Sequence, residues 1–258
     1  MKVGVGEFAT DLEPGSAAWR AVADRVRPER PELLLLGEMP FGPWMAAGEV
    51  ADPATFDRVS RLHEGGLGTL GDLGASVILA TRPRREGGRP VNEAFVWTAQ
   101  SGVLPAHTKQ YFPDEPGYHE ARWFEAGERH FRVVQAGPLR VGFLICTEVM
   151  FNEHARRYGR EGAQVIAVPR ATGNESLSRW LVALRMAAIV SGCYVLSSNR
   201  GGRDAKGQTF GGRGWVIDPR GEVLCETSAA SPLAFCELDA ASVRSAQAEY
   251  PCYVPELP

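Results

Sequence analysis

Three residues that lie far apart in the sequence each follow or end an apolar run, and together they have the side chains of a nucleophilic catalyst. Glu38 comes just after residues 33–36, Lys109 follows an extended segment, and Cys146 ends the run 141–146. A thiolate can attack a carbonyl or nitrile carbon, a carboxylate can accept and return the proton, and an ammonium group can stabilise the negative charge that develops. The three side chains therefore predict acyl-transfer chemistry.

Cys146 lies between a predicted strand and a predicted helix. Residues 141–146 read Val-Gly-Phe-Leu-Ile-Cys, and Thr147, Glu148 and a helical pattern follow. The backbone N–H groups and the dipole at a helix N-terminus stabilise a thiolate, so we expect Cys146 to be ionised and nucleophilic. A single cysteine in an apolar run is more often a small buried hydrophobic residue. The interpretation of Cys146 as a nucleophile therefore depends on the other two candidate residues.

Glu38 and Lys109 are informative only in combination with Cys146. A glutamate at the C-terminal end of a buried strand lies where open α/β sheets bind their ligands, although a lone glutamate there is commonly solvated. A lone lysine in the segment around Lys109 would be an exposed loop residue. Each of the three groups follows a different predicted strand, and such strand ends can meet at one edge of an α/β fold.

The elements that must position these groups alternate between strands and helices, which indicates one α/β domain over residues 1–258. The all-leucine run at 33–36 is typical of a strand that is covered on both faces. The predicted strands are 2–8, 33–36, 76–80, 93–98, 103–107, 131–134, 141–146, 164–168 and 193–197, the predicted helices are 17–26, 56–62, 152–161 and 177–190, and residues 215–224 form a hairpin.

Composition excludes several classes of protein. A net charge of −3 gives no basic surface for nucleic acid, and no apolar stretch is long enough for a membrane span. The five histidines have no paired ligand spacing, and the five cysteines have no CxxC spacing, so we expect neither a metal site nor a disulfide framework. No signal peptide precedes the first strand, and we expect a cytoplasmic protein. The cysteines taken as core or surface thiols are Cys193, Cys225, Cys236 and Cys252.

The three segments, in this order, resemble the Glu-Lys-Cys signature of the nitrilase superfamily, the carbon–nitrogen hydrolases. The resemblance extends over nearly the whole chain, and Glu120 falls where that family carries its second active-site glutamate. The matching segments are Lys109 with Pro113, Gly117, Glu120 and Trp123-Phe124, the nucleophile block 142–169, and two C-terminal blocks at 198–200 and 210–224.

The resemblance implies a fold, a mechanism and an assembly. The fold would be a four-layer α-β-β-α sandwich, and family members associate through their outer helices, so a homodimer or a larger homo-oligomer is expected. Cys146 would form a thioester, and Glu38 would be the general base. Lys109 and the backbone N–H of Thr147 would hold the oxyanion, and Glu120 would orient Lys109. No metal or organic cofactor is implied.

The substrate is less well defined by the sequence. Several branches of the superfamily place arginine three or four residues after the nucleophile, whereas this chain has Val149 and Met150, which disfavours an N-carbamoyl amino acid. We expect a small-molecule amide, with a nitrile or an N-carbamoyl compound as the alternative. A soluble N-acyltransferase that uses the same thioester is a second class of function, and a binding protein that has lost activity is a third.

Five further side chains are candidates for the substrate pocket. Phe41, Trp44 and Phe151 are predicted to form an apolar wall, and Arg170 and Thr172 follow the strand at 164–168 and would reach the substrate. For each of the five, packing in the core or exposure at the surface is the competing interpretation.

Overall fold

Thirteen strands form one continuous sheet with two halves that pack face to face. The computed structural model describes residues 1–128 and 131–255, and His130, one of the histidines considered above, lies outside them. The first half has the order β13-β1-β2-β3-β4-β5, and the second has the order β6-β7-β8-β9-β11-β12, with β10 beside β9. Residues 7–9 of β1 pair with residues 199–201 of β9 and join the halves. The strands are β1 (Lys2–Ala9), β2 (Leu33–Leu35), β3 (Val77–Glu86), β4 (Arg89–Thr98), β5 (Gly102–Thr108), β6 (Val134–Ala136), β7 (Leu139–Phe143), β8 (Val165–Pro169), β9 (Tyr194–Arg203), β10 (Thr209–Gly211), β11 (Trp215–Ile217), β12 (Val223–Glu226) and β13 (Leu233–Glu237).

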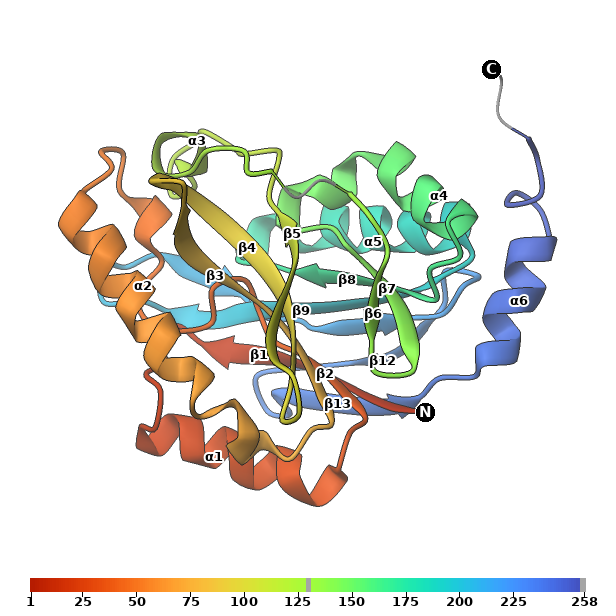
Figure 1. Cartoon of the computed structure of the whole chain (residues 1–258), viewed down its shortest axis with the longest axis horizontal. Helices are drawn as coiled ribbons and strands as arrows, with labels where there is room; N and C mark the ends of the chain where they lie inside the picture. The colour runs from red at the N-terminus through yellow and green to blue at the C-terminus, as the bar shows by residue number, and fades with distance from the viewer. Residues whose placement is uncertain (129–130, 256–258) are drawn as a thin grey trace.

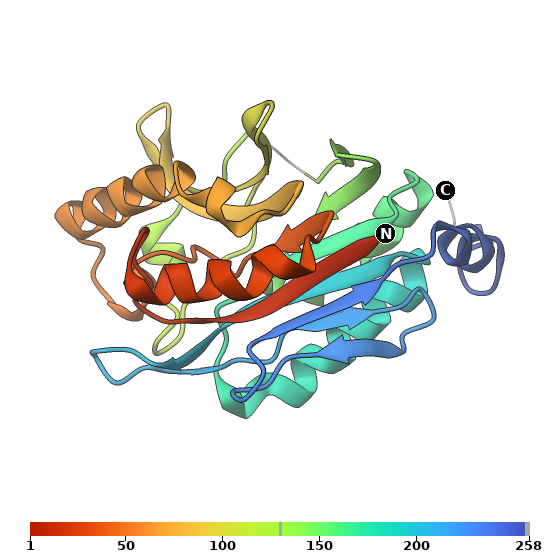
Figure 2. The ribbon, with the colours of Figure 1, turned by 90° about the horizontal axis from the view of Figure 1, so that it is seen from below.

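Helices cover the outer face of each half, so the predicted four-layer α-β-β-α arrangement is confirmed (Figure 1, Figure 2). One helical layer lies against the first half, another lies against the second half, and a last helix packs at the end of the sandwich where the chain begins. Within the described residues, no helix combines the length and the apolar character that crossing a membrane requires. The helices are α1 (Ala17–Val26), α2 (Pro53–Leu67), α3 (Glu120–Trp123), α4 (Asn152–Arg160), α5 (Leu177–Ser191) and α6 (Ala240–Ala248), with short 3₁₀ turns η1 (Arg27–Glu29), η2 (Met45–Ala47), η3 (Leu70–Leu73), η4 (Cys146–Met150) and η5 (Asn174–Ser176).

The leucine run is buried on both faces, as its composition predicts. Leu33 and Leu35 point into the core between the two halves, whereas Leu34 and Leu36 pack beneath α1. This alternation follows from the two-residue period of a strand. Each fully buried leucine contributes about 2 kcal/mol relative to exposure. The run therefore anchors the strand after which Glu38 is placed.

The strand directions explain why the candidate residues can meet. Strands β1, β2 and β3 run parallel to one another, and β7, β8, β9 and β1 do so as well. The antiparallel β4 returns the chain, so β5 has the same direction as β3. The C-terminal ends of β2, β5, β7 and β8 consequently lie at one end of the sandwich, which we call the catalytic end. The opposite end, where these strands begin, is the N-terminal end.

Candidate active site

Lys109 lies at the centre of a buried cluster of charged side chains. Its Nζ donates hydrogen bonds to Glu38 Oε1 at 2.8 Å and to Glu120 Oε2 at 2.6 Å. All three side chains are at most 1% exposed. A buried ion pair costs desolvation free energy that only good geometry and further hydrogen bonds offset. Three ionisable groups held so closely out of water indicate a functional site.

Glu38 has one engaged and one free carboxylate oxygen. The side-chain amide of Asn92 on β4 also donates to Glu38 Oε1, at 2.8 Å, while Glu38 Oε2 is buried without a hydrogen-bond partner in the described structure. A buried acceptor without a partner costs about 1–3 kcal/mol, so its retention needs a reason. Proton transfer supplies one, because Oε2 is the atom left free to accept a proton. The sequence pattern gave no signal for Asn92.

Burial and neighbouring charges shift the pKa values of the cluster. Burial alone would lower the pKa of Lys109, but the carboxylates of Glu120 and Glu38 outweigh it, and the pKa is raised. Burial raises the pKa of Glu120 to about 8, against the opposing effect of Lys109 and with a contribution from Glu38. Lys109 is therefore a permanent cation near neutral pH, whereas Glu120 is largely protonated there.

Cys146 occupies a strained turn rather than a long helix N-terminus. It has a φ of 51° and begins the five-residue turn η4, and α4 starts only at Asn152. Such a φ is uncommon for a residue with a side chain and is found preferentially at functional sites. The turn directs Cys146 into the cavity described below, at the end of the strand region that contains β7.

The predicted thiolate is wrong for the free protein. Burial, followed by the negative charge of Glu38, raises the pKa of Cys146 well above its ordinary value. Lys109 and a hydrogen bond from the Ala171 N–H act in the opposite direction without prevailing. The resting side chain is thus a thiol, and nucleophilic attack requires that a base remove its proton as the bond to carbon forms.

Glu148 connects the nucleophile turn to the lysine segment. Its carboxylate accepts hydrogen bonds from the backbone N–H groups of Ile145 and Gln110, both at 2.7 Å, and it pairs with His107 Nε2 at 2.9 Å. Ile145 immediately precedes Cys146, and Gln110 immediately follows Lys109. One fully buried side chain therefore fixes the backbone before Cys146 and the backbone after Lys109 relative to each other.

Two further side chains from β9 hold the loops of the site. The guanidinium of Arg200 donates to the backbone oxygens of Glu38, Met39 and Gly42, and so it fixes the loop that presents Glu38. Asn199 accepts from the Thr172 N–H at 2.9 Å and fixes the loop after β8. The resemblance included residues 198–200 without giving them roles, and these loop contacts were not predicted.

A cavity of about 70 Å³ opens beside Cys146. Thr147 and Thr172, two of the candidates from the sequence, are among its lining residues, and so are Tyr118 and Trp180, which were not candidates. By comparison with the 10–15 Å³ that one water needs, this space holds a group of about five non-hydrogen atoms. The remaining lining residues are Pro113, Glu115, Glu120, Ala171, Gly173 and Ser176.

The other four candidate pocket residues are not among those that line this cavity. Phe41 packs against Trp19 in the core, with ring centroids 5.1 Å apart, because its backbone turns away from the cavity. The remaining three are held by other contacts. Phe151 stacks on Tyr111, Trp44 donates its indole N–H to the Gly117 oxygen, and the buried guanidinium of Arg170 is engaged by Ser197, Thr172 and the Arg213 oxygen.

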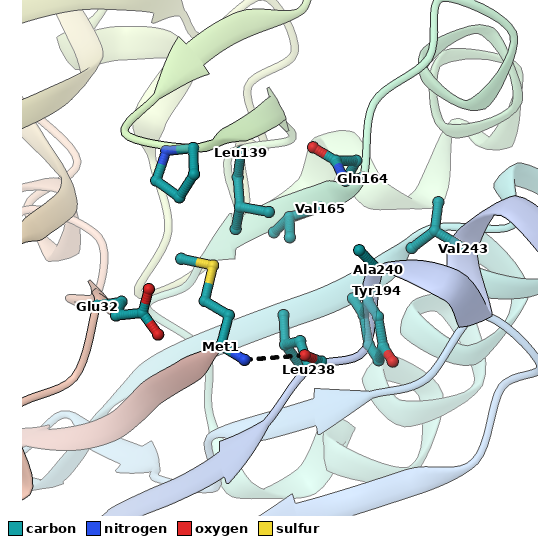
Figure 3. Close-up of a pocket in the computed structure, with 10 residues that line it drawn as sticks. Met1, Glu32, Leu139, Gln164, Val165, Tyr194, Leu238, Ala240 and Val243 are labelled. Carbon is teal, nitrogen blue, oxygen red and sulfur yellow. Dashed lines mark hydrogen bonds between the residues drawn. The ribbon is translucent and has the colours of Figure 1, made fainter.

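A larger cavity, of about 340 Å³, lies at the N-terminal end (Figure 3). Met1, Leu139 and Val165 line it from the strand starts, and Val243 lines it from α6. Its lining shares no residue with that of the smaller cavity. In the ranges 1–128 and 131–255, no group of three His, Cys, Asp or Glu side chains is arranged to hold a metal ion.

Comparison with known sequences identifies related proteins. A family model described as carbon-nitrogen hydrolase matches residues 3–248. N-carbamoylputrescine amidase from Arabidopsis thaliana is 28% identical over 149 residues, which are 52% of this chain and 50% of that protein. Citrullinase from Francisella tularensis is 28% identical over 160 residues, which are 58% of this chain and 56% of that protein. The matched segment spans about half the length of these curated relatives.

Solved structures show the same fold. A carbon-nitrogen hydrolase from Helicobacter pylori G27 superposes with a TM-score of 0.86 at 21% identity, over 98% of this chain and 94% of that one. A mutant amidase from Nesterenkonia sp. AN1 in complex with butyramide has a TM-score of 0.76 at 21% identity, over 95% and 93% of the two chains.

Proposed function

Because the chain belongs to the carbon–nitrogen hydrolase family, we propose that it hydrolyses a small-molecule amide through a thioester on Cys146. One observation carries the proposal. The buried Lys109 is hydrogen-bonded to both Glu38 and Glu120, and this cluster interacts electrostatically with Cys146. These side chains would supply a general base, a cation and a nucleophile in a buried site.

Each group has a defined role in the proposed reaction. Glu38 Oε2 takes the thiol proton as Cys146 Sγ attacks the amide carbon. Lys109 uses two of its three N–H donors on carboxylates, which leaves the third for the oxyanion together with the Thr147 N–H. Glu38 then protonates the departing nitrogen, and the thioester remains. In the second half, Glu38 deprotonates a water molecule that attacks the thioester carbon. The C–S bond then breaks, the carboxylic acid leaves, and Glu38 returns the proton to Cys146 Sγ. Glu120 orients Lys109 throughout.

The cavity favours a short substrate without a carboxylate. Its volume of about 70 Å³ admits only a few atoms, and its lining within the described residues contains no lysine or arginine. Glu115 lines the mouth, and Arg170 is occupied by protein acceptors. A neutral or cationic amide fits these charges. The complex of the Nesterenkonia amidase with butyramide supports a short aliphatic amide. The N-carbamoylputrescine amidases support the alternative, an N-carbamoyl amine.

A substrate panel tests the proposal directly. Short primary amides, N-carbamoyl amines and the matching nitriles are incubated with the protein, and the release of ammonia is measured together with the intact mass. We expect hydrolysis of amides and an acyl adduct on Cys146. The Cys146→Ala variant should be folded and inactive, and retained turnover in it would exclude the thioester mechanism. An adduct that is released only when an amine is added would instead favour the acyltransferase, and turnover of nitriles alone would identify a nitrilase.

The outer helices support an assembly of two or more copies. The described side chains of Val182 and Met186 on α5, and of Met150 and Phe151 before α4, are large, apolar and exposed. Exposed apolar patches of this kind mark protein interfaces. We expect a homodimer through this face, and Val182→Glu should shift the molar mass measured by light scattering toward the monomer. The cytoplasmic location predicted from cysteine usage stays a prediction.

A further inference from the structure

Two half-buried thiols, Cys225 and Cys236, lie on edge strands that belong to different halves of the sheet. Cys225 on β12 pairs with Val216 at the edge of the second half, and Cys236 on β13 pairs with Val3 at the edge of the first. The chain passes directly from β12 to β13 through residues 227–232, and the two strands are neighbours (Figure 1). Both side chains pack against the core between the halves, and each thiol lies near enough to the other to shift its pKa.

The two thiols are chemically unequal. The neighbouring Cys236 thiol lowers the pKa of Cys225, whereas the Cys225 thiol, followed by burial, raises the pKa of Cys236. A thiol with a lowered pKa is the better nucleophile toward an oxidant, and a second thiol beside it can resolve the product.

The remaining three cysteines differ from this pair. Cys146 and Cys193 are buried, and the Cys252 thiol donates its hydrogen bond to the Ile189 oxygen. Cys252 is partly exposed too, but the thiol near it, Cys193, is buried, so Cys225 and Cys236 are the pair of described cysteines in which both neighbouring thiols are partly exposed.

We propose that Cys225 and Cys236 form an oxidation site that a hydroperoxide converts into an intramolecular disulfide between the two halves of the sheet. The Cys225 thiolate attacks one peroxide oxygen, the O–O bond breaks, and a sulfenic acid and water form. The Cys236 sulfur, after losing its proton, then attacks the Cys225 sulfur and displaces hydroxide, which leaves as water. Two thiols and one hydrogen peroxide thus give one disulfide and two waters, with two electrons passing to the peroxide.

The disulfide would stabilise the fold without altering the catalytic cavity. It closes the short loop 226–235 and so restricts the unfolded chain, which should raise the melting temperature by roughly 5 °C. No residue of β12 or β13 lines the catalytic cavity within the described structure. The oxidised protein should therefore differ from the reduced protein in its melting temperature.

The test uses the whole chain with Cys146→Ala, so that the proposed nucleophile cannot react. After treatment with hydrogen peroxide and then catalase, free thiols are alkylated, and the intact mass and the peptide map are recorded. We expect a monomeric chain in which two thiols are lost, the mass before alkylation falls by about 2 Da, and a peptide pair links Cys225 to Cys236. Dithiothreitol should restore both thiols and the original melting temperature.

Matched variants separate this pair from general oxidation. Cys252→Ser should still form the disulfide, whereas Cys225→Ser and Cys236→Ser should not, and their folding is checked by circular dichroism. The same peptide map is also recorded for the unsubstituted chain, so that the result does not depend on a substitution. A disulfide that involves Cys193 or Cys252, a disulfide between two chains, or oxidation of the pair to sulfinic acids without a link would each overturn the proposal.

Discussion

The two ends of the sandwich are built from the same strands and differ in almost every other respect. At the catalytic end the cavity is small and Glu38, Lys109 and Glu120 are buried beside it. At the N-terminal end the cavity is several times larger, its lining is mainly apolar, and Glu32 at its margin is exposed. We therefore assign the proposed chemistry to the smaller cavity and not to the larger one. In this fold, buried charge identifies the site better than volume does.

The difference also has an energetic side. Burial of three ionisable groups and a strained cysteine destabilises the catalytic end, and the loops there are held by Asn199, Arg200 and Glu148. The N-terminal end needs no such network, because its cavity is bounded by strand starts and α6. Substitutions of the same type should consequently have very different effects at the two ends.

The largest contrast is expected between Glu38→Gln and Glu32→Gln. Loss of the general base should lower kcat/KM for an amide by about 10³-fold, whereas the change at Glu32 should leave it within twofold. Removal of the Glu38 charge should also lower the pKa of Cys146, because that charge helps to raise it. The rate of iodoacetamide alkylation as a function of pH measures this shift. If turnover slows although the thiol ionises more easily, the loss of rate comes from the missing proton acceptor and not from a smaller fraction of thiolate. An unchanged pKa of Cys146 would contradict the role of Glu38 in raising that pKa.

A smaller effect is expected for Glu148→Gln. The amide cannot accept from two backbone N–H groups and pair with His107 as the carboxylate does, so the free energy of unfolding should fall by about 2 kcal/mol. The turnover number kcat should fall by about 10–100-fold with KM nearly unchanged, because Cys146 and Lys109 lose their fixed separation. Urea unfolding and steady-state kinetics measure the two effects. Glu153→Gln, a substitution of an exposed residue on α4, is the control. A rise in KM as large as the fall in kcat would argue against a positioning role for Glu148.

The pH dependence provides a third test. Since the pKa of Glu120 is about 8, this side chain becomes charged as the pH rises past that value. A second negative charge then disfavours the Cys146 thiolate, and kcat/KM should decline by up to about tenfold per pH unit. The contribution of Glu120 to stability is complete below its unfolded pKa of 4.5 and is lost as the pH rises through 8. Glu120→Gln should remove both dependences, and an alkaline decline that persists in this variant would assign it to another group.

Local sequence patterns predicted the main strands and hairpins and the order of the candidate catalytic residues along the chain. The leucine run is a doubly buried strand, and residues 215–224 form the expected hairpin of β11 and β12. These features depend on neighbouring residues, which a sequence displays directly. The family was recognised because the Glu, Lys and Cys segments resemble its signature, and this resemblance implied the layered fold. The match over residues 3–248 confirms the family.

Long-range contacts explain what the sequence did not reveal. Asn92 lies on β4 and Glu38 lies in the loop after β2, and nothing in the residues around Asn92 indicates their hydrogen bond. Phe41 follows Glu38 closely yet packs on Trp19, because Met39 adopts a φ of 43° and redirects the chain. The ionisation state of Cys146 was predicted incorrectly, since burial and Glu38 outweigh the short turn that follows it.

The smallest effect is expected at the N-terminal end, for Val243→Met. Val243 on α6 is buried at the margin of the larger cavity, and a flexible methionine can extend into that space. The added apolar burial should stabilise the fold by less than about 1 kcal/mol and raise the melting temperature by roughly 2 °C. Calorimetry and amide kinetics on the same preparation measure stability and rate together, with kcat/KM expected within twofold of the unsubstituted chain. A larger change in rate would mean that strain at one end passes along the shared strands to Cys146, and the two ends could then no longer be treated as independent.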